Sequence, residues 1–405
     1  MNKKLTLIGI DGGASKVSIW QIIIQKQRST LGKHHYKSVY SHQPSFNKNF
    51  RPVPVEKQLI NLNKNIFDLM PEEIMQGTAV LSAIIEGIEE IWKKNDKLPI
   101  LIGIGMPGLK TPDKRGISVM KNGPRIPNFI DHLMKRIQQI GIPIIQPITT
   151  IGSDADFCGF GEEYAVNGLM KGVNNVYYLG GGTGVADAIK LKGTLLSFDT
   201  IHSWMLKTWQ LRTTDGISLE TLLSVRGIAE NFTKLTNDKS SVNTLQSLNA
   251  RQILNLAIEG NRAASTVISL TGKWIARLLY ERITTLNKGW RSLPYFCIPK
   301  DITLSLDHPY YGSIFDRIII GQRTGELLNS HGKNNILRSQ INNTIFQLIN
   351  ESIHLNNEVK TQYLERLNTD LICISNLRAA PALGAGIQAW KHYIRDDKPI
   401  KLTND

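Results

Sequence analysis

Short apolar runs and stretches of helical periodicity alternate along the chain. Apolar runs typical of buried strands occupy residues 5–10, 17–25, 99–105, 143–152, 175–180, 185–192 and 316–321. Apolar residues recur at helical spacing over 78–94, 129–140, 157–166, 251–286 and 381–394, and Pro381 suits the first turn of the last helix. Strands that alternate with helices in this way predict an α/β protein.

The strands fall into two similar sets, each of which opens with a hairpin. Residues 5–10 pair with 17–25 in the first set, and residues 175–180 pair with 185–192 in the second. A chain of 405 residues is too long for one ordinary domain, so we expect two domains of related construction. The polar, basic and proline-containing stretch 30–58 is predicted to be a long loop or an insertion.

Both hairpins have turns that suit phosphate, because glycine lets backbone N–H groups approach a ligand closely. The first turn holds Asp11, Gly12, Gly13 and Lys16, and the second holds Gly181, Gly182, Thr183 and Gly184. Each turn alone is a weak signal, but two such turns opening two similar halves reinforce each other. Asp11 suits a Mg²⁺ ion held through its water shell. Lys16 is either a ligand contact or a solvent-facing strand residue.

Two other nucleotide motifs are excluded or disfavoured. No G-x4-G-K-[ST] segment occurs, so neither turn is a Walker A loop. Residues 103–108 satisfy G-x-G-x-x-G after a strand, but Pro107 and Pro112 favour a loop where a dinucleotide site needs a helix.

The acidic segment after the strand at 143–152 is the main candidate for catalysis. Asp154 and Asp156 follow Ser153 immediately before a predicted helix. An acid at a strand's carboxyl end faces the crevice of an α/β fold, but it can also cap the helix. We assign capping to Asp156 and chemistry to Asp154, although their order alone does not separate the two roles.

Four segments in the same order resemble the ROK sugar kinases of the hexokinase/actin/Hsp70 superfamily: LIGIDGGASKVSIW, LIGIGMPGLKT, IGSDADFCGFGEEYA and VYYLGGGTGVADAIKLKG. Weaker similarities continue through SLETLLSVRGIAE, DRIIIGQRTGELL and NLRAAPALGAGIQAW, so the resemblance runs from Leu5 to about Trp390. It implies a two-lobed actin-like ATPase fold of the ribonuclease H type with an interlobe cleft. The lobes would be residues 1–165 with 386–405, and residues 166–385.

The resemblance also implies an activity and its participants. We expect a cytoplasmic, ATP- and Mg²⁺-dependent kinase that phosphorylates a hexose or amino sugar hydroxyl, with Asp154 as general base. The two glycine turns would bind phosphates, and a homodimer is expected. The remaining implied contacts are Gly321 and Gly384 beside adenosine, and Gly108, Asn122, Ser153 and Glu220 beside the sugar.

The chain departs from this family at several positions. The family's Glu-x-Gly-His after the second turn is absent, and Asp199 with His202 is either its substitute or a coincidental pair in a loop. Residues 208–220 lack the family's zinc-binding cysteines, so no zinc site is expected. Ser153 replaces the usual Asn, and Gln322 follows Gly321 where Gly-Gly is common.

Composition narrows the classes of partner. No run reaches about 18 apolar residues, so no membrane span is expected. The three cysteines are odd in number, far apart and without a CxxC pair, so neither a disulfide framework nor a zinc ribbon is indicated. Residues 1–65 hold 11 Lys or Arg against two acids, which is about +9 of the net +14. These charges lack aromatic interleaving or helix-turn-helix spacing, so we expect a solvated basic surface rather than nucleic-acid binding, with an anionic partner as the alternative.

Two other functions remain open at this point. A sugar or nucleotide sensor on the same fold is favoured by the lost Glu-x-Gly-His, and opposed by Asp11 and Asp154. A family repressor would also carry an N-terminal helix-turn-helix, which is not expected here. The second alternative is an actin-like or activator-type ATPase. Activator enzymes need paired cysteines for an iron–sulfur cluster, and this sequence has no such pair.

Overall fold

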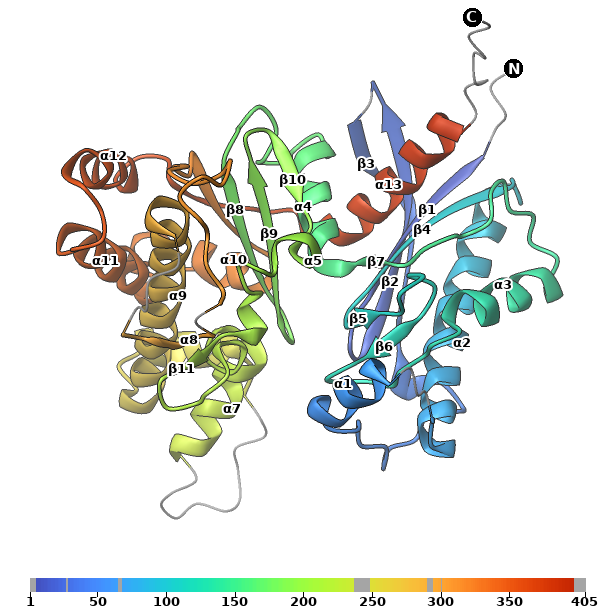
Figure 1. The fold of residues 1–405 in the computed structure, drawn as a ribbon. Coiled ribbons are helices and arrows are strands. Elements are labelled where there is room, and N and C mark those ends of the chain that lie inside the picture. Colours follow the sequence, from blue (N-terminus) through green and yellow to red (C-terminus); the bar gives the residue numbers. More distant parts are fainter. Residues whose placement is uncertain are drawn as a thin grey trace, which may run out of the picture. The chain divides into compact units, whose positions relative to one another are not determined.

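A computed structural model of the chain describes residues 5–26, 28–64, 68–236, 248–289, 294–299 and 301–396 (Figure 1). It divides into two compact units: residues 1–168 with 379–405, and residues 169–378. The division predicted from the sequence fell after 165 and after 385. Helix α13 (Ala380–Asp396) belongs as a whole to the first unit because it packs on that unit's strands. The part of 386–405 beyond residue 396 lies outside the described residues.

The first unit is built on a five-stranded sheet in the order β3-β2-β1-β4-β7. Strand β1 is antiparallel to β2 and parallel to β4; β2 and β3 are antiparallel, and β4 and β7 are parallel. The strands are β1 (Thr6–Gly12), β2 (Lys16–Gln25), β3 (Arg28–Val39), β4 (Ile100–Met106) and β7 (Gly152–Ser153). A small hairpin of β5 (Leu109–Lys110) and β6 (Ile117–Val119) follows β4.

Helices cover both faces of this sheet. Apolar residues of β1 and β4 form one core with α2 (Pro71–Lys94) and α3 (Phe129–Gln139). On the other face α13 packs against β1, β4 and α4 (Asp154–Tyr164). The unit also contains η1 (Tyr40–His42) and α1 (Val55–Asn63).

Two glycines explain why α13 can lie so close to the sheet. Gly9 and Gly103 are directly paired across β1 and β4. A Cβ at Gly9 would come within 2.0 Å of the Ala382 carbonyl oxygen, and one at Gly103 within 1.9 Å of the Ala385 oxygen. The repeated isoleucine–glycine alternation of both strands therefore places isoleucine toward α2 and glycine beneath α13.

The structure corrects two predictions in this unit. Residues 28–39, most of which fall in the predicted loop 30–58, form the edge strand β3, which hydrophobic alternation did not reveal because its exposed and its inward positions are both largely polar. Residues 143–152 were predicted as a strand, but only Gly152 and Ser153 pair with β4, apart from an isolated bridge between Ile144 and Ile100. Pro143 and Pro147 lack the N–H groups that a ladder requires.

The second unit repeats this plan. Its sheet has the order β10-β9-β8-β13-β14, with two antiparallel pairs followed by two parallel pairs. The strands are β8 (Val176–Gly181), β9 (Val185–Leu191), β10 (Thr194–Leu196), β13 (Arg317–Gly321) and β14 (Ile372–Ile374). Strands β11 (Arg212–Thr213) and β12 (Phe296–Cys297) form a separate pair.

The helices of the second unit pack around the long helix α9 (Arg262–Lys288), which buries most of its length in that unit's hydrophobic core. The other helices are α5 (Phe198–Ile201), α6 (Leu219–Leu223), α7 (Val225–Thr236), α8 (Ala250–Ile258), α10 (Gln322–Asn329), α11 (Ile336–Asn350) and α12 (Asn357–Leu367), with short turns η2 (Thr208–Gln210) and η3 (Gly332–Asn334). Two units with the same strand order and directions confirm the prediction of two similar α/β halves. No helix in the described ranges is both long and apolar enough to cross a membrane.

Candidate functional site

In the first unit, the carboxyl ends of three parallel strands bring the predicted residues together. Asp11 of β1 is paired with Gly105 of β4, and Gly105 is paired with Gly152 of β7. Asp154 follows two residues after Gly152, and its Cα lies 3.5 Å from the point where a Cβ at Gly105 would sit. The two aspartates predicted to do chemistry therefore lie at one edge of one sheet.

Helix α4 begins at Asp154, which is three residues earlier than the sequence predicts. Ser153 is its N-cap, and the Ser153 hydroxyl accepts a weak hydrogen bond from the Asp156 N–H at 3.5 Å. The assignment of Asp156 as the capping residue was therefore wrong. Both aspartates occupy the first turn, where the helix dipole favours negative charge.

The two carboxylates interact strongly. Burial, and after it the neighbouring charge of Asp154, raise the pKa of Asp11 to about 7, although Lys16 partly offsets both. The ionised form of Asp11 is therefore disfavoured beside Asp154, and Lys16 offsets this only in part. A divalent cation close to Asp11 would favour its ionised form.

The first glycine turn is held in shape by its own backbone and by a tyrosine. The Gly13 N–H donates to the Lys16 carbonyl at 2.8 Å, and the buried Tyr40 hydroxyl donates to the Gly13 carbonyl at 3.1 Å. A Cβ at Gly12 would meet the Met106 sulfur at 2.0 Å, so any side chain here would require Met106 to move. The Ala14 N–H has no partner among the described residues, so it remains available to a ligand. Sequence reasoning missed Tyr40, which stands in the stretch assigned to a loop.

The second glycine turn has the same construction. The Gly182 N–H donates to the Gly184 carbonyl at 2.8 Å, and the Gly182 carbonyl accepts from the Val225 N–H at the start of α7. The Thr183 N–H has no partner in the described part of the chain. Both turns thus keep one internal amide bond and leave the amide at the tip open, which is an arrangement suited to phosphate oxygens.

Two further residues lie against the second turn. Glu220 accepts from the Val185 N–H at 3.3 Å, and its carboxylate oxygen is 2.7 Å from where a Cβ at Gly184 would sit. The Thr324 hydroxyl would be 1.9 Å from a Cβ at Gly181, and it is buried without a hydrogen-bond partner among the described residues. The structure therefore places Glu220, predicted as a sugar contact, beside a predicted phosphate turn.

The segment at Gly321 explains a departure noted in the sequence. Gly321 ends β13 beside Gly180, and Gln322 forms a bridge with Gly181. Gln322 has φ of +53°, a conformation that glycine adopts more readily than other residues. A second glycine here would thus be conformationally favoured, and Gln322 meets the same geometry at some cost.

The remaining predicted sugar contacts lie in different surroundings. Gly108 is exposed with φ of +85°, and Asn122 is half-buried in the loop after β6. Asp199, on the four-residue helix α5, and His202, which follows that helix directly, are both exposed. The His202 ring bonds the Asp199 carbonyl at 2.8 Å, and the Asp199 carboxylate pairs with Lys207 at 2.8 Å. These contacts fit a surface turn, and a role in sugar binding stays a prediction.

Two glycine motifs have structural explanations of their own. A Cβ at Gly384 would come within 2.1 Å of the Phe157 carbonyl, so the contact between α13 and α4 already requires glycine there. Its assignment to the adenosine side stays a prediction.

The segment 103–108 leads from β4 into the two-residue strand β5 rather than a helix, which confirms that it is not a dinucleotide loop.

The described residues contain no group of three or more His, Cys, Asp or Glu arranged to hold a metal ion. Mg²⁺ needs no such group when phosphates and waters complete its octahedron, because one or two carboxylates then suffice. Asp11, the residue predicted to hold Mg²⁺ through its water shell, fits that requirement, because a nearby cation would favour its ionised form.

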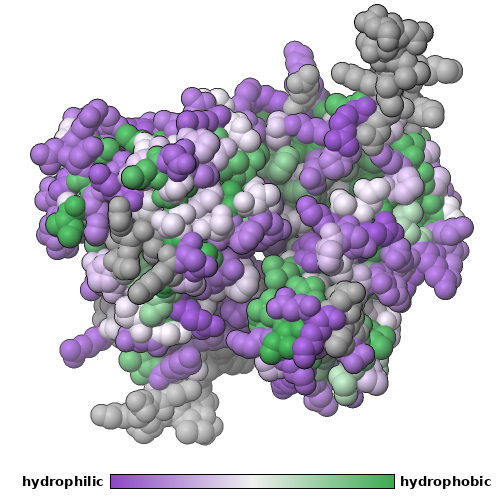
Figure 2. Space-filling model, in the orientation of Figure 1, coloured by the Kyte–Doolittle hydropathy of each residue, from purple (hydrophilic) through white to green (hydrophobic). Residues whose placement is uncertain are grey.

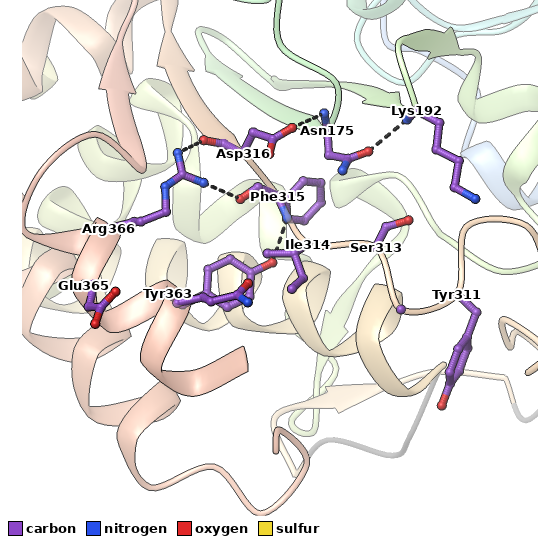
Figure 3. Close-up of a pocket in the computed structure, with 12 residues that line it drawn as sticks. Asn175, Lys192, Tyr311, Ser313, Ile314, Phe315, Asp316, Tyr363, Glu365 and Arg366 are labelled. Carbon is purple, nitrogen blue, oxygen red and sulfur yellow. Dashed lines mark hydrogen bonds between the residues drawn. The ribbon is translucent and has the colours of Figure 1, made fainter. Parts of the chain in front are cut away.

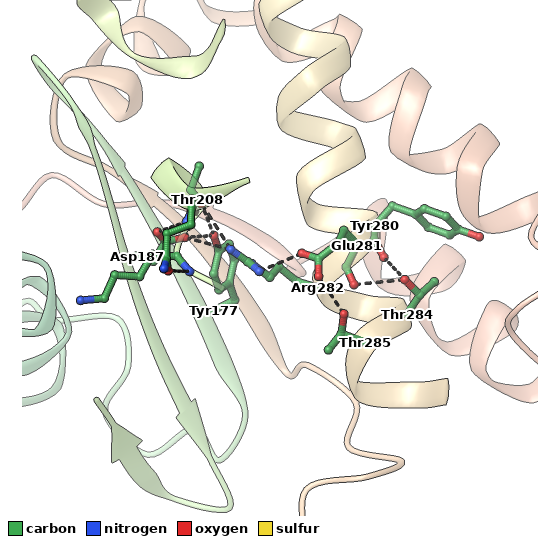
Figure 4. A network of polar contacts seen from close by, with 10 residues as sticks. Tyr177, Asp187, Thr208, Tyr280, Glu281, Arg282, Thr284 and Thr285 are labelled. Carbon is green, nitrogen blue, oxygen red and sulfur yellow. Dashed lines mark hydrogen bonds and ion pairs between the residues drawn. The ribbon is translucent and has the colours of Figure 1, made fainter. Parts of the chain in front are cut away.

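A buried polar network stabilises the two strands that carry the second turn (Figure 4). The Tyr177 hydroxyl donates to Asp187 at 2.5 Å, the Thr208 N–H donates to the same carboxylate at 2.8 Å, and Arg282 of α9 lies 3.4 Å from it. Arg282 also pairs with Glu281 at 2.9 Å, and both side chains are fully buried. The network ties β8 and β9, which carry the turn, to the central helix of the unit.

A cavity of about 620 Å³ lies elsewhere in the second unit (Figure 3). It lies near the amino ends of β8 and β13, whereas the glycine turn and Gly321 lie at the carboxyl ends. Its polar groups are largely engaged in structure: the Asn175 N–H donates to Asp316 at 2.7 Å, and the Arg366 guanidinium donates to the Phe315 carbonyl at 3.3 Å. None of the predicted site residues lines it.

No family model matches the chain, and no curated protein matches it. Solved structures do match in fold. A ROK family glucokinase from Streptomyces griseus in complex with glucose and AMPPNP has 13% identity and a TM-score of 0.59, covering 95% of this chain and 99% of its own.

Two further structures show the same likeness. A ROK hexokinase from Thermus thermophilus has 15% identity and a TM-score of 0.52, covering 96% of this chain and 99% of its own. A ROK family transcriptional regulator, a homologue of the E. coli MLC protein, has 15% identity and a TM-score of 0.54, covering 96% of this chain and 79% of its own. The chain therefore has the fold of the ROK proteins, which is the actin-like ATPase fold predicted from the sequence.

Proposed function

We propose that this protein is a divergent ROK-type kinase that transfers the γ-phosphoryl group of ATP to a sugar hydroxyl. The observation that carries the proposal is the meeting of Asp11 and Asp154 at the carboxyl ends of β1, β4 and β7. Fold alone does not imply activity, because the same fold occurs in a transcriptional regulator. An enzymatic role therefore depends on the side chains at that edge.

Both glycine turns would bind the phosphates of ATP through their open amides, at Ala14 and Thr183. Asp11 would hold Mg²⁺ through its water shell, and the ion would neutralise phosphate charge when bound. Lys16 lowers the pKa of Asp11 and so lies close enough to add positive charge there.

Asp154 would act as the general base. Its carboxylate accepts the proton of a sugar hydroxyl as that oxygen forms a bond to the γ-phosphorus, and the bond from that phosphorus to the leaving oxygen of ADP breaks. Such help contributes about 10²–10⁴ in rate, and positioning and charge neutralisation account for more. The acceptor's own positioning would come from Asn122, Ser153, Gly108 and Glu220.

A pair of matched substitutions tests the role of Asp154. Asp154→Asn should lower kcat for sugar phosphorylation by about 10²–10⁴ while the protein still folds and binds ATP. Asp156→Asn is the control, because it removes the same charge from the same helical turn, and it should change kcat by less than about tenfold. Equal losses in both variants would show that the turn's charge matters, and that Asp154 has no special part.

A sensor that binds sugar without turnover is the second candidate. It is favoured by the missing Glu-x-Gly-His and by the engagement of Asp199 and His202 in surface contacts. Calorimetric binding of a sugar together with no ADP release from ATP would support the sensor over the kinase.

A further inference from the structure

Helix α1 buries a glutamine and exposes an isoleucine. Gln58 is only 1% exposed and is the one buried residue of the helix, whereas Ile60 is 54% exposed. Figure 2 shows hydrophobic residues on the surface over α1 and the adjoining hairpin. An amphipathic helix held by hydrophobic packing would show the opposite arrangement. The docking of α1 therefore depends on what the Gln58 amide does.

The Gln58 side chain is paired with the backbone of Met120. Its amide oxygen accepts from the Met120 N–H at 2.7 Å, and its amide nitrogen donates to the Met120 carbonyl at 3.0 Å. The same nitrogen donates to the Val53 carbonyl at 2.6 Å. Both polar groups of Met120 are thus fixed by one side chain that is 62 residues away in sequence.

A second buried side chain fixes the chain five residues further on. Glu73, in the first turn of α2, accepts from the Arg125 N–H at 2.9 Å. It also holds the Arg125 guanidinium through two bonds of 2.9 and 2.7 Å, and both side chains are 2% exposed. Removing either partner would leave an uncompensated buried charge.

The segment between these two anchors is the loop that carries Asn122. Ile117 and Ile126 exchange two backbone hydrogen bonds of 2.9 and 3.0 Å, which close the base of the loop. Met120 and Arg125 are then fixed by Gln58 and Glu73, so residues 121–124 lie between two immobilised points. Lys121 is exposed, Asn122 is half-buried, and Gly123 and Pro124 are buried.

We propose that Gln58 and Glu73 are positioning residues for the acceptor sugar, and that α1 is a specificity element acting through the loop 121–124. This rests on the proposed function, in which Asn122 contacts the sugar. Gln58, in the polar stretch 30–58 that was predicted to be a loop or an insertion, then has a function that the sequence alone did not indicate. A buried amide contributes little more to stability than an apolar side chain of its size, but its hydrogen bonds fix direction and register.

The chain offers a matched control. Gln76 of α2 is also buried, at 7% exposed, and its side chain accepts from the Asn47 N–H at 3.0 Å instead of touching the loop. Gln58→Leu and Gln76→Leu each remove a buried amide. Only Gln58→Leu should release Met120.

The test compares KM for sugar and for ATP in both variants, with hydrogen exchange of the peptide covering 117–126. Gln58→Leu should raise KM for the sugar about tenfold through loss of the two loop bonds, while KM for ATP changes by less than about twofold. The peptide should exchange faster than in Gln76→Leu, which should leave both constants near wild type. If Gln58→Leu does not fold, Gln58→Met keeps the length of the side chain and removes both loop bonds, and the same split is expected.

Equal shifts of sugar KM in the two glutamine variants would overturn the inference. A wild-type protein that phosphorylates no sugar would instead refute the proposed function and, with it, the loop's part in sugar specificity. In that case hydrogen exchange still shows whether Gln58 immobilises the loop. Equal exchange rates of the peptide covering 117–126 in the two variants would show that it does not.

Discussion

Replacing Asp11 with asparagine should change how the stability of the protein depends on pH. The pKa of Asp11 rises from 3.8 to about 7 in the folded protein. That difference corresponds to a penalty of about 4 kcal/mol on the ionised form in the folded state. Asparagine is uncharged at every pH, so Asp11→Asn removes the penalty.

The direction of the pH dependence follows from whether the folded or the unfolded chain keeps the Asp11 proton to higher pH. Below about pH 4 Asp11 is protonated in both the folded and the unfolded chain, and its full contribution to stability is present. Between about pH 4 and 7 the unfolded chain ionises first, so the free energy of unfolding falls as the pH rises. Relative to Asp11→Asn, the wild type should lose about 2.5 kcal/mol between pH 5 and pH 8.

Urea unfolding of the two proteins at several pH values, without magnesium, measures this difference. Two further variants test the assigned causes. Burial is the largest cause and Asp154 the second, so Asp154→Asn should reduce the pH dependence yet leave part of it. Lys16→Met should increase it, because Lys16 lowers the pKa of Asp11. A stability difference between wild type and Asp11→Asn that stays constant from pH 5 to pH 8 would refute the reasoning.

Two other substitutions test the packing that supports the site. Gly9→Ala should destabilise the first unit by about 3 kcal/mol, because its Cβ would come within 2.0 Å of the Ala382 carbonyl; an unchanged melting temperature would contradict the close approach of α13. Arg282→Met should cost about 3–5 kcal/mol in urea unfolding, since Asp187 and Glu281 would remain buried without their cation. A loss below about 1 kcal/mol would mean that the network relaxes when the arginine is removed.

The sequence predicted the parts of the molecule that follow from local chemistry. Two glycine turns after apolar strands, an acid at the end of another, and the repeated strand pattern were all visible, because each depends on neighbouring residues. The order of the strands in each sheet agrees with two similar halves.

Features fixed by distant partners were not visible. Strand β3 has a largely polar exposed side, and as an edge strand it lacks the apolar alternation of its neighbours. Gln58 and Glu73 are ordinary polar residues in sequence, and only their contacts with Met120 and Arg125 give them a part. Glu220 was assigned to the sugar from resemblance, and its bond to the Val185 N–H depends on how α6 packs against the hairpin. Ser153 and Asp156 compete for one cap, and propensity alone ranks them almost equally.

The central claim is that phosphoryl transfer ends on a sugar. Purified protein with ATP, magnesium and a panel of hexoses and amino sugars should release ADP only when one of the sugars is present. Phosphorus NMR should then show one phosphorylated sugar for each ADP formed. Release of ADP at the same rate without any sugar, or tight sugar binding with no ADP and no sugar phosphate, would contradict the account.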